Sequence, residues 1–187
     1  KWEKLGQDLN GDSPNDFFGR PVSIDSSGKV VLIASSMNNS NGNNSGQVKV
    51  FNLFNDSTWI QKGNDIYGES SGDFFGSSID ISNNNEIIAI GAKRNNGNGL
   101  NSGHVRVFEY NNHNWIQIGL DIDGESAGDE SGYSVSLSNN GDRIAIGALK
   151  NDGNGSNSGH VRVFQFQNQN WIQIGNDIDG EFAEDWS

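Results

Sequence analysis

The stretch "FGSSIDISNNNEIIAIGAKRNNGNGLNSGHVRVF", residues 75–108, returns slightly altered as "GYSVSLSNNGDRIAIGALKNDGNGSNSGHVRVF" at residues 132–164. Each copy holds three apolar bursts separated by runs rich in Asn, Gly and Ser. The first and third bursts alternate apolar and polar residues, which is typical of a β-strand with one buried face. The continuously apolar second burst is typical of a strand buried on both faces. Short polar runs favour tight turns, so we expect antiparallel strands in each copy.

Four tryptophans give the period of this repetition. Trp2, Trp59, Trp115 and Trp171 are spaced by 57, 56 and 56 residues, in the segments "WEKLGQDLNGD", "WIQKGNDIYGE", "WIQIGLDIDGE" and "WIQIGNDIDGE". Repetition at a fixed period of this length is typical of repeat architectures. One period is predicted to hold four strands, which in the second copy are residues 75–82, 86–92, 103–110 and 115–119.

A four-stranded unit of this size cannot bury both of its faces alone, so copies must pack on one another. The predicted fold is therefore all-β, with three four-stranded antiparallel blades of the β-propeller type. We expect a single repeat array over residues 1–187, with blade 1 at residues 18–74, blade 2 at 75–130, and blade 3 with the start of the next linker at 131–187. Residues 1–17 are predicted to form an extra N-terminal outer strand, Trp2 to Leu9, and a loop.

Closed propellers have about four to eight blades. Three blades therefore predict either a fragment of a longer repeat protein or a subunit that associates with its own copies, as a six-bladed dimer or an open filament.

These sequences resemble the FG-GAP repeat of integrin α-subunits and of surface proteins of marine microbes. Phe18-Gly19 and Phe75-Gly76 match its first signature, and Gly91-Ala92 and Gly147-Ala148 match the start of its second. The third copy instead has Ser131-Gly132, the first has Ala34-Ser35, and no copy has the signature proline. The resemblance implies a propeller in a secreted or cell-surface protein. The family's calcium loop between strands 1 and 2 has no counterpart in "DSSGK", "SNNNE" or "SNNGD", so that site is not expected here.

The composition excludes several classes of function. The chain of 187 residues carries a net charge of −12, which opposes binding to nucleic acid and to anionic membrane surfaces. It contains no cysteine, which excludes disulfides, thiolate metal sites and a cysteine nucleophile. Its hydrophobic content of 33% supports a packed core, and no segment is long and apolar enough to insert into a membrane.

The loop after each fourth strand is acidic, and the meander places it at the same end of the blade as the loop between strands 2 and 3. Carboxylate and amide oxygens are the ligands that Ca²⁺ prefers. A calcium site is therefore one hypothesis for this face, and the alternative is that the same side chains cap their own turns. The candidate metal ligands are Asp121, Asp123, Glu125, Asp129, Asp152 and Asn154.

His104 and His160 open the third strand beside these loops, but the first copy has Gln47 there. We therefore expect the histidines to hold the loop by hydrogen bonds rather than to act as ligands or bases. The tryptophans are expected to pack between blades or against a neighbouring subunit rather than to stack on sugars. Sequons allow N-glycosylation, if the host secretes the protein through a eukaryotic pathway, at Asn38, Asn43, Asn55 and Asn154.

No catalytic constellation remains once the repeats are subtracted, so the sequence predicts that the protein is not an enzyme. The first hypothesis is an extracellular structural or adhesive protein that self-associates through blade edges, with copies of itself or adjoining repeats as partners. A second is a binding module for glycans, for other surface proteins or for calcium-dependent ligands, which would use the Asp/Asn-rich face. A propeller-type glycosidase is a third and less favoured alternative.

Overall fold

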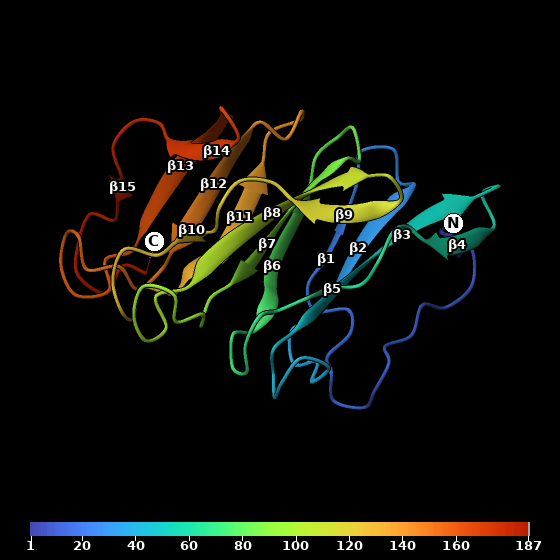
Figure 1. Ribbon diagram of the computed structural model, residues 1–187, viewed down its shortest axis with the longest axis horizontal. Helices are drawn as coiled ribbons and strands as arrows, with labels where there is room; N and C mark the ends of the chain where they lie inside the picture. Colours follow the sequence, from blue (N-terminus) through green and yellow to red (C-terminus); the bar gives the residue numbers. More distant parts are fainter. Residues whose placement is uncertain (187) are drawn as a thin grey trace.

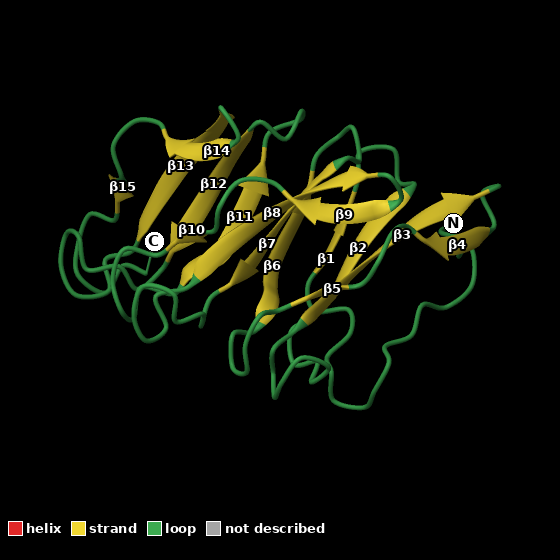
Figure 2. Ribbon diagram, in the orientation of Figure 1, coloured by secondary structure: helices red, strands yellow, loops and turns green. Residues whose placement is uncertain are grey.

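The structure is a computed structural model that describes residues 1–186 as three β-sheets set side by side (Figure 1). Colouring by secondary structure shows strands and loops and no helix in this part of the chain (Figure 2). No helix within residues 1–186 is therefore long and apolar enough to span a membrane. The all-β fold predicted from the repeats is confirmed.

Each sheet has the same antiparallel order and corresponds to one blade. Four strands follow one another across the sheet, as predicted, and a short fifth strand pairs with the third. Blade 1 consists of β1 (Val22–Ile24), β2 (Val30–Ser35), β3 (Gln47–Phe54), β4 (Thr58–Gln61) and β5 (Ile66–Tyr67). Blade 2 consists of β6 (Phe75–Ile81), β7 (Ile87–Ala92), β8 (His104–Asn111), β9 (Asn114–Gln117) and β10 (Ile122–Asp123). Blade 3 consists of β11 (Ser131–Leu137), β12 (Arg143–Ala148), β13 (His160–Gln167), β14 (Asn170–Gln173) and β15 (Ile178–Asp179).

The fifth strand of each blade was not predicted. In blade 2 the chain turns after β9 at Gly119, whose φ is 72°, and β10 then pairs with the first residues of β8, with Asp123 opposite His104. The strand is too short to show an alternating pattern, and its acidic residues disguise it as a loop. Its pairing brings the acidic segment directly beside the start of the third strand.

The N-terminal outer strand is a wrong prediction, because residues 2–9 form no strand. In each blade the fourth strand pairs with a third strand, and residues 1–17 supply no such partner. The segment is instead tied to β4 by side chains: the amide of Gln7 donates to the carbonyl of Trp59 at 2.7 Å and accepts from its N–H at 3.0 Å.

The blades are held together by two apolar cores, one at each junction. Between blades 1 and 2, side chains such as Leu32 and Val50 pack with Ile81 and Ile88. Between blades 2 and 3, the other face of blade 2 packs in the same way on blade 3. Blade 2, which packs on a neighbouring blade on each side, is therefore apolar on both faces. This explains the continuous apolar run of its second strand.

Trp115 and Trp171 each dock on the preceding repeat, whereas Trp2 is fully exposed. The indole Nε1 of Trp115 donates to the carbonyl of Lys62 at 2.8 Å, and that of Trp171 donates to the carbonyl of Ile118 at 3.1 Å. A Cβ built on Gly63 would lie 2.8 Å from Cδ1 of Trp115, so only glycine admits the ring. The expected packing between blades is confirmed for Trp115 and Trp171.

Candidate functional site

A polar cluster recurs where the short fifth strand meets the third strand. Each cluster takes one carboxylate from the acidic segment of the preceding repeat, one side chain from the start of the third strand, and one carboxylate from the loop after the fourth strand. Cluster 1 is Asp12, Gln47 and Asp65; cluster 2 is Glu69, His104 and Asp121; cluster 3 is Glu125, His160 and Asp177. Every cluster therefore joins two successive repeats.

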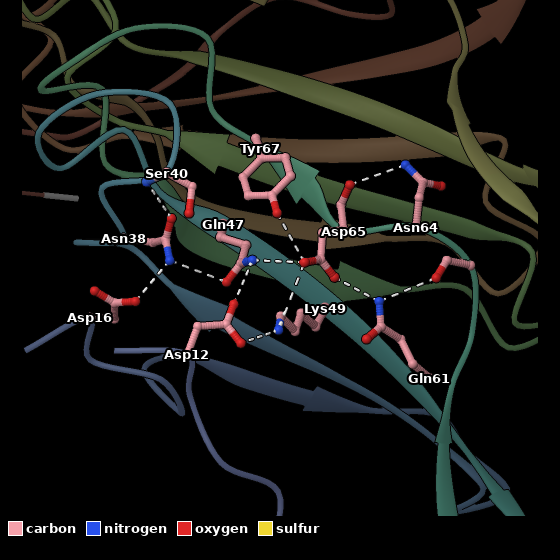
Figure 3. Close-up of polar contacts among 11 residues, drawn as sticks. Asp12, Asp16, Asn38, Ser40, Gln47, Lys49, Gln61, Asn64, Asp65 and Tyr67 are labelled. Carbon is pink, nitrogen blue, oxygen red and sulfur yellow. Dashed lines mark hydrogen bonds and ion pairs between the residues drawn. The ribbon is translucent and has the colours of Figure 1, made fainter. Parts of the chain in front are cut away.

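Cluster 1 is satisfied by its own side chains (Figure 3). Nε2 of the buried Gln47 donates to Oδ2 of Asp12 at 3.1 Å and to Oδ2 of Asp65 at 3.0 Å. The ammonium of Lys49 lies 2.6 Å from Asp12 and 3.8 Å from Asp65. Its hydrogen bond lowers the pKa of Asp12, against the opposing effect of burial and with help from Gln47. Both carboxylates thus have a donor or a cation within reach.

Cluster 3 has a histidine where cluster 1 has the glutamine. The side chain of His160 is 1% exposed, and its Nδ1 lies 3.9 Å from Oε2 of Glu125 and 3.9 Å from Oδ2 of Asp177. Both separations are too long for hydrogen bonds. Neither ring nitrogen of His160 has a hydrogen-bond partner among the described residues.

Cluster 2 repeats this arrangement. Nδ1 of the buried His104 lies 3.5 Å from Oδ2 of Asp121 and 4.0 Å from Oδ1 of Asp123. Unlike His160, His104 forms a long hydrogen bond through Nδ1, which lowers the pKa of Asp121; burial opposes that shift and Gln117 adds to it. Nε2 of His104 has no partner within residues 1–186. In both clusters one ligand atom from each of the three residues lies within 4.8 Å of the others.

The carboxylates of clusters 2 and 3 are held from behind. Gln117 donates to Oδ1 of Asp121 at 2.7 Å, and Gln173 donates to Oδ1 of Asp177 at 2.6 Å. Each aspartate therefore turns its other oxygen, Oδ2, toward the histidine. The glutamates are held similarly, since an arginine of the third strand approaches only Oε1: Arg106 at 3.4 Å from Glu69 and Arg162 at 3.6 Å from Glu125.

The six predicted metal ligands do not converge on one site. Asp121 and Asp123 lie in and beside cluster 2, whereas Glu125 reaches across the junction into cluster 3. The separation arises because the acidic segment crosses from one blade to the next between Asp123 and Glu125.

The remaining three predicted ligands also take part in turn and junction contacts. Asp129 and Asp152 line one acidic pocket with Glu125, and calcium binding there stays a prediction. Asp129 is buried and accepts from Nδ2 of Asn151 at 2.9 Å. Oδ1 of Asp152 accepts the backbone N–H of Asn157 at 2.8 Å. The amide of Asn154 donates to the carbonyl of Gly180 at 2.9 Å.

Of the four sequons, the one at Asn38 is also a wrong prediction. Asn38 is 2% exposed and its Nδ2 donates to Asp16 at 2.8 Å, so the folded protein has no room for a sugar on that nitrogen. The amide of Asn154 is engaged as described, while Asn43 and Asn55 are exposed and remain predicted sites.

A second feature is a cleft of roughly 420 Å³ at the start of the first strands. It is lined by Phe17, Arg20, Ser36, Met37, Phe74, Ser77, Lys93, Arg94 and Tyr133. At equivalent positions the repeats differ here, since Arg20 corresponds to Ser77 and to Tyr133. The cleft cannot be predicted from the repeat pattern alone, because its residues stand out only when the differences between repeats are mapped to one place. That mapping was the available signal.

Comparison with known proteins finds a matching repeat family and similar folds. An FG-GAP repeat family model matches residues 68–108 and 121–164. Among solved structures, the chain is similar to a protein of Bacteroides uniformis assigned as a 6-phosphogluconolactonase, with a TM-score of 0.56 and 14% identity over 84% of this chain and 40% of that one. It is also similar to hydrazine synthase of Kuenenia stuttgartiensis, with a TM-score of 0.53 and 13% identity over 84% of this chain and 36% of that one.

At these identities the structural likenesses concern the fold alone, and the chain spans less than half the length of both proteins. No curated protein sequence matches the chain. The repeated sheets, the indole that docks each later repeat on its predecessor and the two matched segments lead to one conclusion: the chain has a propeller-like fold, and two of its repeats match the FG-GAP repeat.

Proposed function

We propose that the chain is a non-enzymatic structural or adhesive module of an extracellular protein, and that its outer blade faces bind further blades of the same kind. The observation that supports this proposal most directly is that both outer faces carry the residues that the inner junctions bury. FG-GAP repeats are typical of extracellular and surface proteins, which supports the location.

The outer face of blade 3 repeats the face that blade 2 buries. Val107 is buried against blade 3, whereas the equivalent Val163 is only half-buried. Ile122 is 5% exposed, whereas the equivalent Ile178 is 62% exposed. Burying such side chains stabilises a contact by roughly 25 cal/mol for each Å² of apolar surface removed from water.

The outer face of blade 1 supplies the complementary surface. Ile79 and Ile81 of blade 2 are buried in the first junction, whereas the equivalent residues of blade 1, Val22 and Ile24, are 59% and 58% exposed. Blade 1 of one copy can therefore pack on blade 3 of another as blade 2 packs on blade 1. This head-to-tail contact is heterologous, so it produces a ring if it closes and a filament if it does not.

One residue makes this outer contact weaker than the inner ones. Arg143 is exposed on blade 3 at the position where Val30 and Ile87 are buried in blades 1 and 2. Burial of an unpaired guanidinium opposes association. We therefore infer a reversible contact rather than a permanent one.

Sedimentation velocity over a range of chain concentrations tests the proposal. The wild-type chain is expected to form species larger than a monomer as concentration rises, and Ile178→Glu or Val22→Glu is expected to abolish them. Leu100→Glu is the matched control, since Leu100 is 71% exposed and lies in a loop outside both faces. A chain that stays monomeric throughout, or that associates equally well in all variants, would contradict the proposal.

A second candidate function is the binding of a small anionic ligand, such as an acidic saccharide, in the cleft at the start of the first strands. Three cations, Arg20, Lys93 and Arg94, line this cleft in a chain of net charge −12. Burial, together with the nearby cations, lowers the pKa of Lys93, and Glu130 opposes this shift. Its ammonium lies 4.7 Å from the ring centre of Tyr133. An anion would offset the mutual repulsion of these cations.

Titration with sulfated and uncharged forms of one oligosaccharide tests the cleft. Lys93→Gln and Arg94→Gln are expected to weaken binding of the sulfated form at least about tenfold, as loss of a charge-assisted hydrogen bond predicts. Lys4→Gln is the control, because Lys4 lies in the N-terminal segment and does not line the cleft. Equal binding by all variants, or none by the wild type, would exclude this function.

A further inference from the structure

We propose that clusters 2 and 3 each bind one divalent metal ion of the zinc class, through Glu69, His104 and Asp121 in cluster 2 and through Glu125, His160 and Asp177 in cluster 3. This inference is independent of the proposed association through blade faces.

The first argument is the unsatisfied histidine. A buried polar nitrogen without a partner costs free energy, so native structures pair such groups with protein, water or an ion. Both nitrogens of the His160 ring lack a partner within the part of the chain that the structure describes, although two carboxylate oxygens face Nδ1. An ion bound between the ring and these oxygens satisfies all three groups together.

The second argument is the spacing of the ligand atoms. Bonds of about 2.0–2.2 Å to a tetrahedral ion place two ligand atoms roughly 3.3–3.6 Å apart. Nδ1 of His104 lies 3.5 Å from Oδ2 of Asp121, and Nδ1 of His160 lies 3.9 Å from its two carboxylate oxygens. These separations, of which the two at His160 are too long for hydrogen bonds, are thus close to those of two ligands on one ion. The carboxylates are partly exposed, so a small inward movement completes the site.

The third argument is that the ligands are positioned from behind. Gln173 holds one oxygen of Asp177, and Arg162 lies on the far oxygen of Glu125. Arg162 is itself fixed, because Nη2 donates to the carbonyl of Asp123 at 2.6 Å. Hydrogen bonds to the outer atoms of ligands orient them and typically contribute tenfold or more to metal affinity. The arginine therefore leaves Oε2 of Glu125 free to face the ring.

Cluster 1 is a natural control within the same chain. There Nε2 of Gln47 donates to one oxygen of each carboxylate, at 3.1 and 3.0 Å, and so bridges the two groups. Lys49, a flexible point charge, reaches both carboxylates, whereas Arg162 does not. Cluster 1 is therefore already neutralised and is not expected to bind metal.

The donor set selects the class of ion. Imidazole nitrogen is a ligand of Zn²⁺ and of Co²⁺, Ni²⁺ and Cu²⁺, whereas Ca²⁺ takes oxygen ligands. Each cluster supplies one nitrogen and two carboxylates, and the fourth position is open to water or, in cluster 2, to Asp123, whose Oδ1 lies 4.0 Å from the ring. The ion would cross-link two repeats, because Glu125 comes from the segment after β10 and His160 from β13.

Calorimetric titration of the full chain with Zn²⁺ is the test, and visible absorption of the Co²⁺ form reports nitrogen–oxygen coordination. The expected stoichiometry is two ions for each chain. His104→Gln and His160→Gln, which copy Gln47, should each remove one ion, and the double variant should remove both. His113→Gln is the matched control, since His113 is an exposed histidine outside the clusters, and it should still bind two.

Asp177→Asn and Glu125→Gln test cluster 3 without altering a buried residue. Each should weaken one of the two sites at least about tenfold, in line with the loss of a ligand or its support. The proposal is overturned if the wild type binds no Zn²⁺, if the double histidine variant binds as many ions as the wild type, or if Ca²⁺ displaces Zn²⁺ from both sites at equal concentration.

Discussion

Repeat 1 and the two repeats that follow it use the same backbone positions for different chemistry. In cluster 1 an amide donates hydrogen bonds to two carboxylates and an ammonium supplies the opposite charge, so both carboxylates have protein partners. In clusters 2 and 3 a buried imidazole faces carboxylates: the His104–Asp121 contact of 3.5 Å is a long hydrogen bond, and the two contacts of His160, at 3.9 Å, are too long for one. The tryptophans differ as well: Trp115 docks on a complete blade, whereas Trp59 docks on an irregular segment. One fold thus supports both a self-contained polar junction and one that favours an ion.

The largest expected effect comes from removing an indole. Trp115 is 4% exposed in the first apolar core, so Trp115→Ala should lower the free energy of unfolding by about 3–5 kcal/mol. Trp59→Ala should cost about 1–2 kcal/mol, since this ring is only half-buried. Urea unfolding of both variants measures the difference. Equal losses would show that the N-terminal segment packs as firmly as a blade.

Zinc should stabilise the later junctions and not the first. At a free Zn²⁺ concentration of 100 times Kd, each occupied site should raise the free energy of unfolding by about 2.7 kcal/mol. Thermal melting with and without chelator measures this effect. The chain with glutamine at positions 104 and 160 should melt at one temperature in both conditions, and a residual zinc effect in that variant would place the ion elsewhere.

Apolar replacement of the central residue should affect the two kinds of cluster oppositely in the absence of metal. Gln47→Leu removes two hydrogen bonds to carboxylates and should cost about 1–2 kcal/mol. His160→Leu removes two nitrogens that have no partners among residues 1–186 and should leave stability unchanged or raise it by about 1 kcal/mol in chelator. Denaturant unfolding compares the two. A large loss in the histidine variant would indicate that the metal-free ring is hydrogen-bonded in solution.

The smallest expected effect is a dependence on acid pH. The pKa of Asp12 is lowered in the folded state, mainly by Lys49, so the charged form stabilises the fold above the ordinary pKa of about 3.8. This contribution is lost as pH falls below that value through the lower folded pKa. In Lys49→Met the free energy of unfolding should fall less on acidification, by about 0.2–1 kcal/mol, as is usual for partly exposed ion pairs. Unfolding at pH 5 and at pH 2.5 measures the effect; identical slopes would exclude a role for this pair.

Much of the fold can be predicted from the sequence because its signals are periodic. Alternation within the bursts predicts strands, the tryptophan spacing predicts blades, and the apolar second strand predicts neighbours on both faces. The fifth strand escapes this reasoning, since two residues such as Ile122 and Asp123 show no alternation and pair only because Gly119 turns the chain back.

The candidate site is predicted less well, because its ligands come from different repeats. The acidic type of residue is right, yet Asp123 and Glu125, two residues apart in sequence, face different histidines. The histidines themselves are set aside by sequence reasoning because Gln47 takes their place in repeat 1. Only the structure shows that Lys49 and Gln47 together bind the carboxylates of cluster 1, whereas His160 makes no hydrogen bond to the carboxylates of cluster 3 within the described residues.

The offset between sheets and junctions bears on how such arrays can be lengthened. Each indole lies on a glycine of the preceding repeat, and each cluster draws a carboxylate from across the junction. A cassette copied from the borders of one sheet would separate these pairs. A cassette cut after Gly63 and after Gly119 instead carries one indole, one histidine and one acidic segment, with a receiving glycine at its end. Duplication at these points preserves every junction, so the unit of construction begins at residue 64 rather than at Phe75, where the sheet that it contains begins.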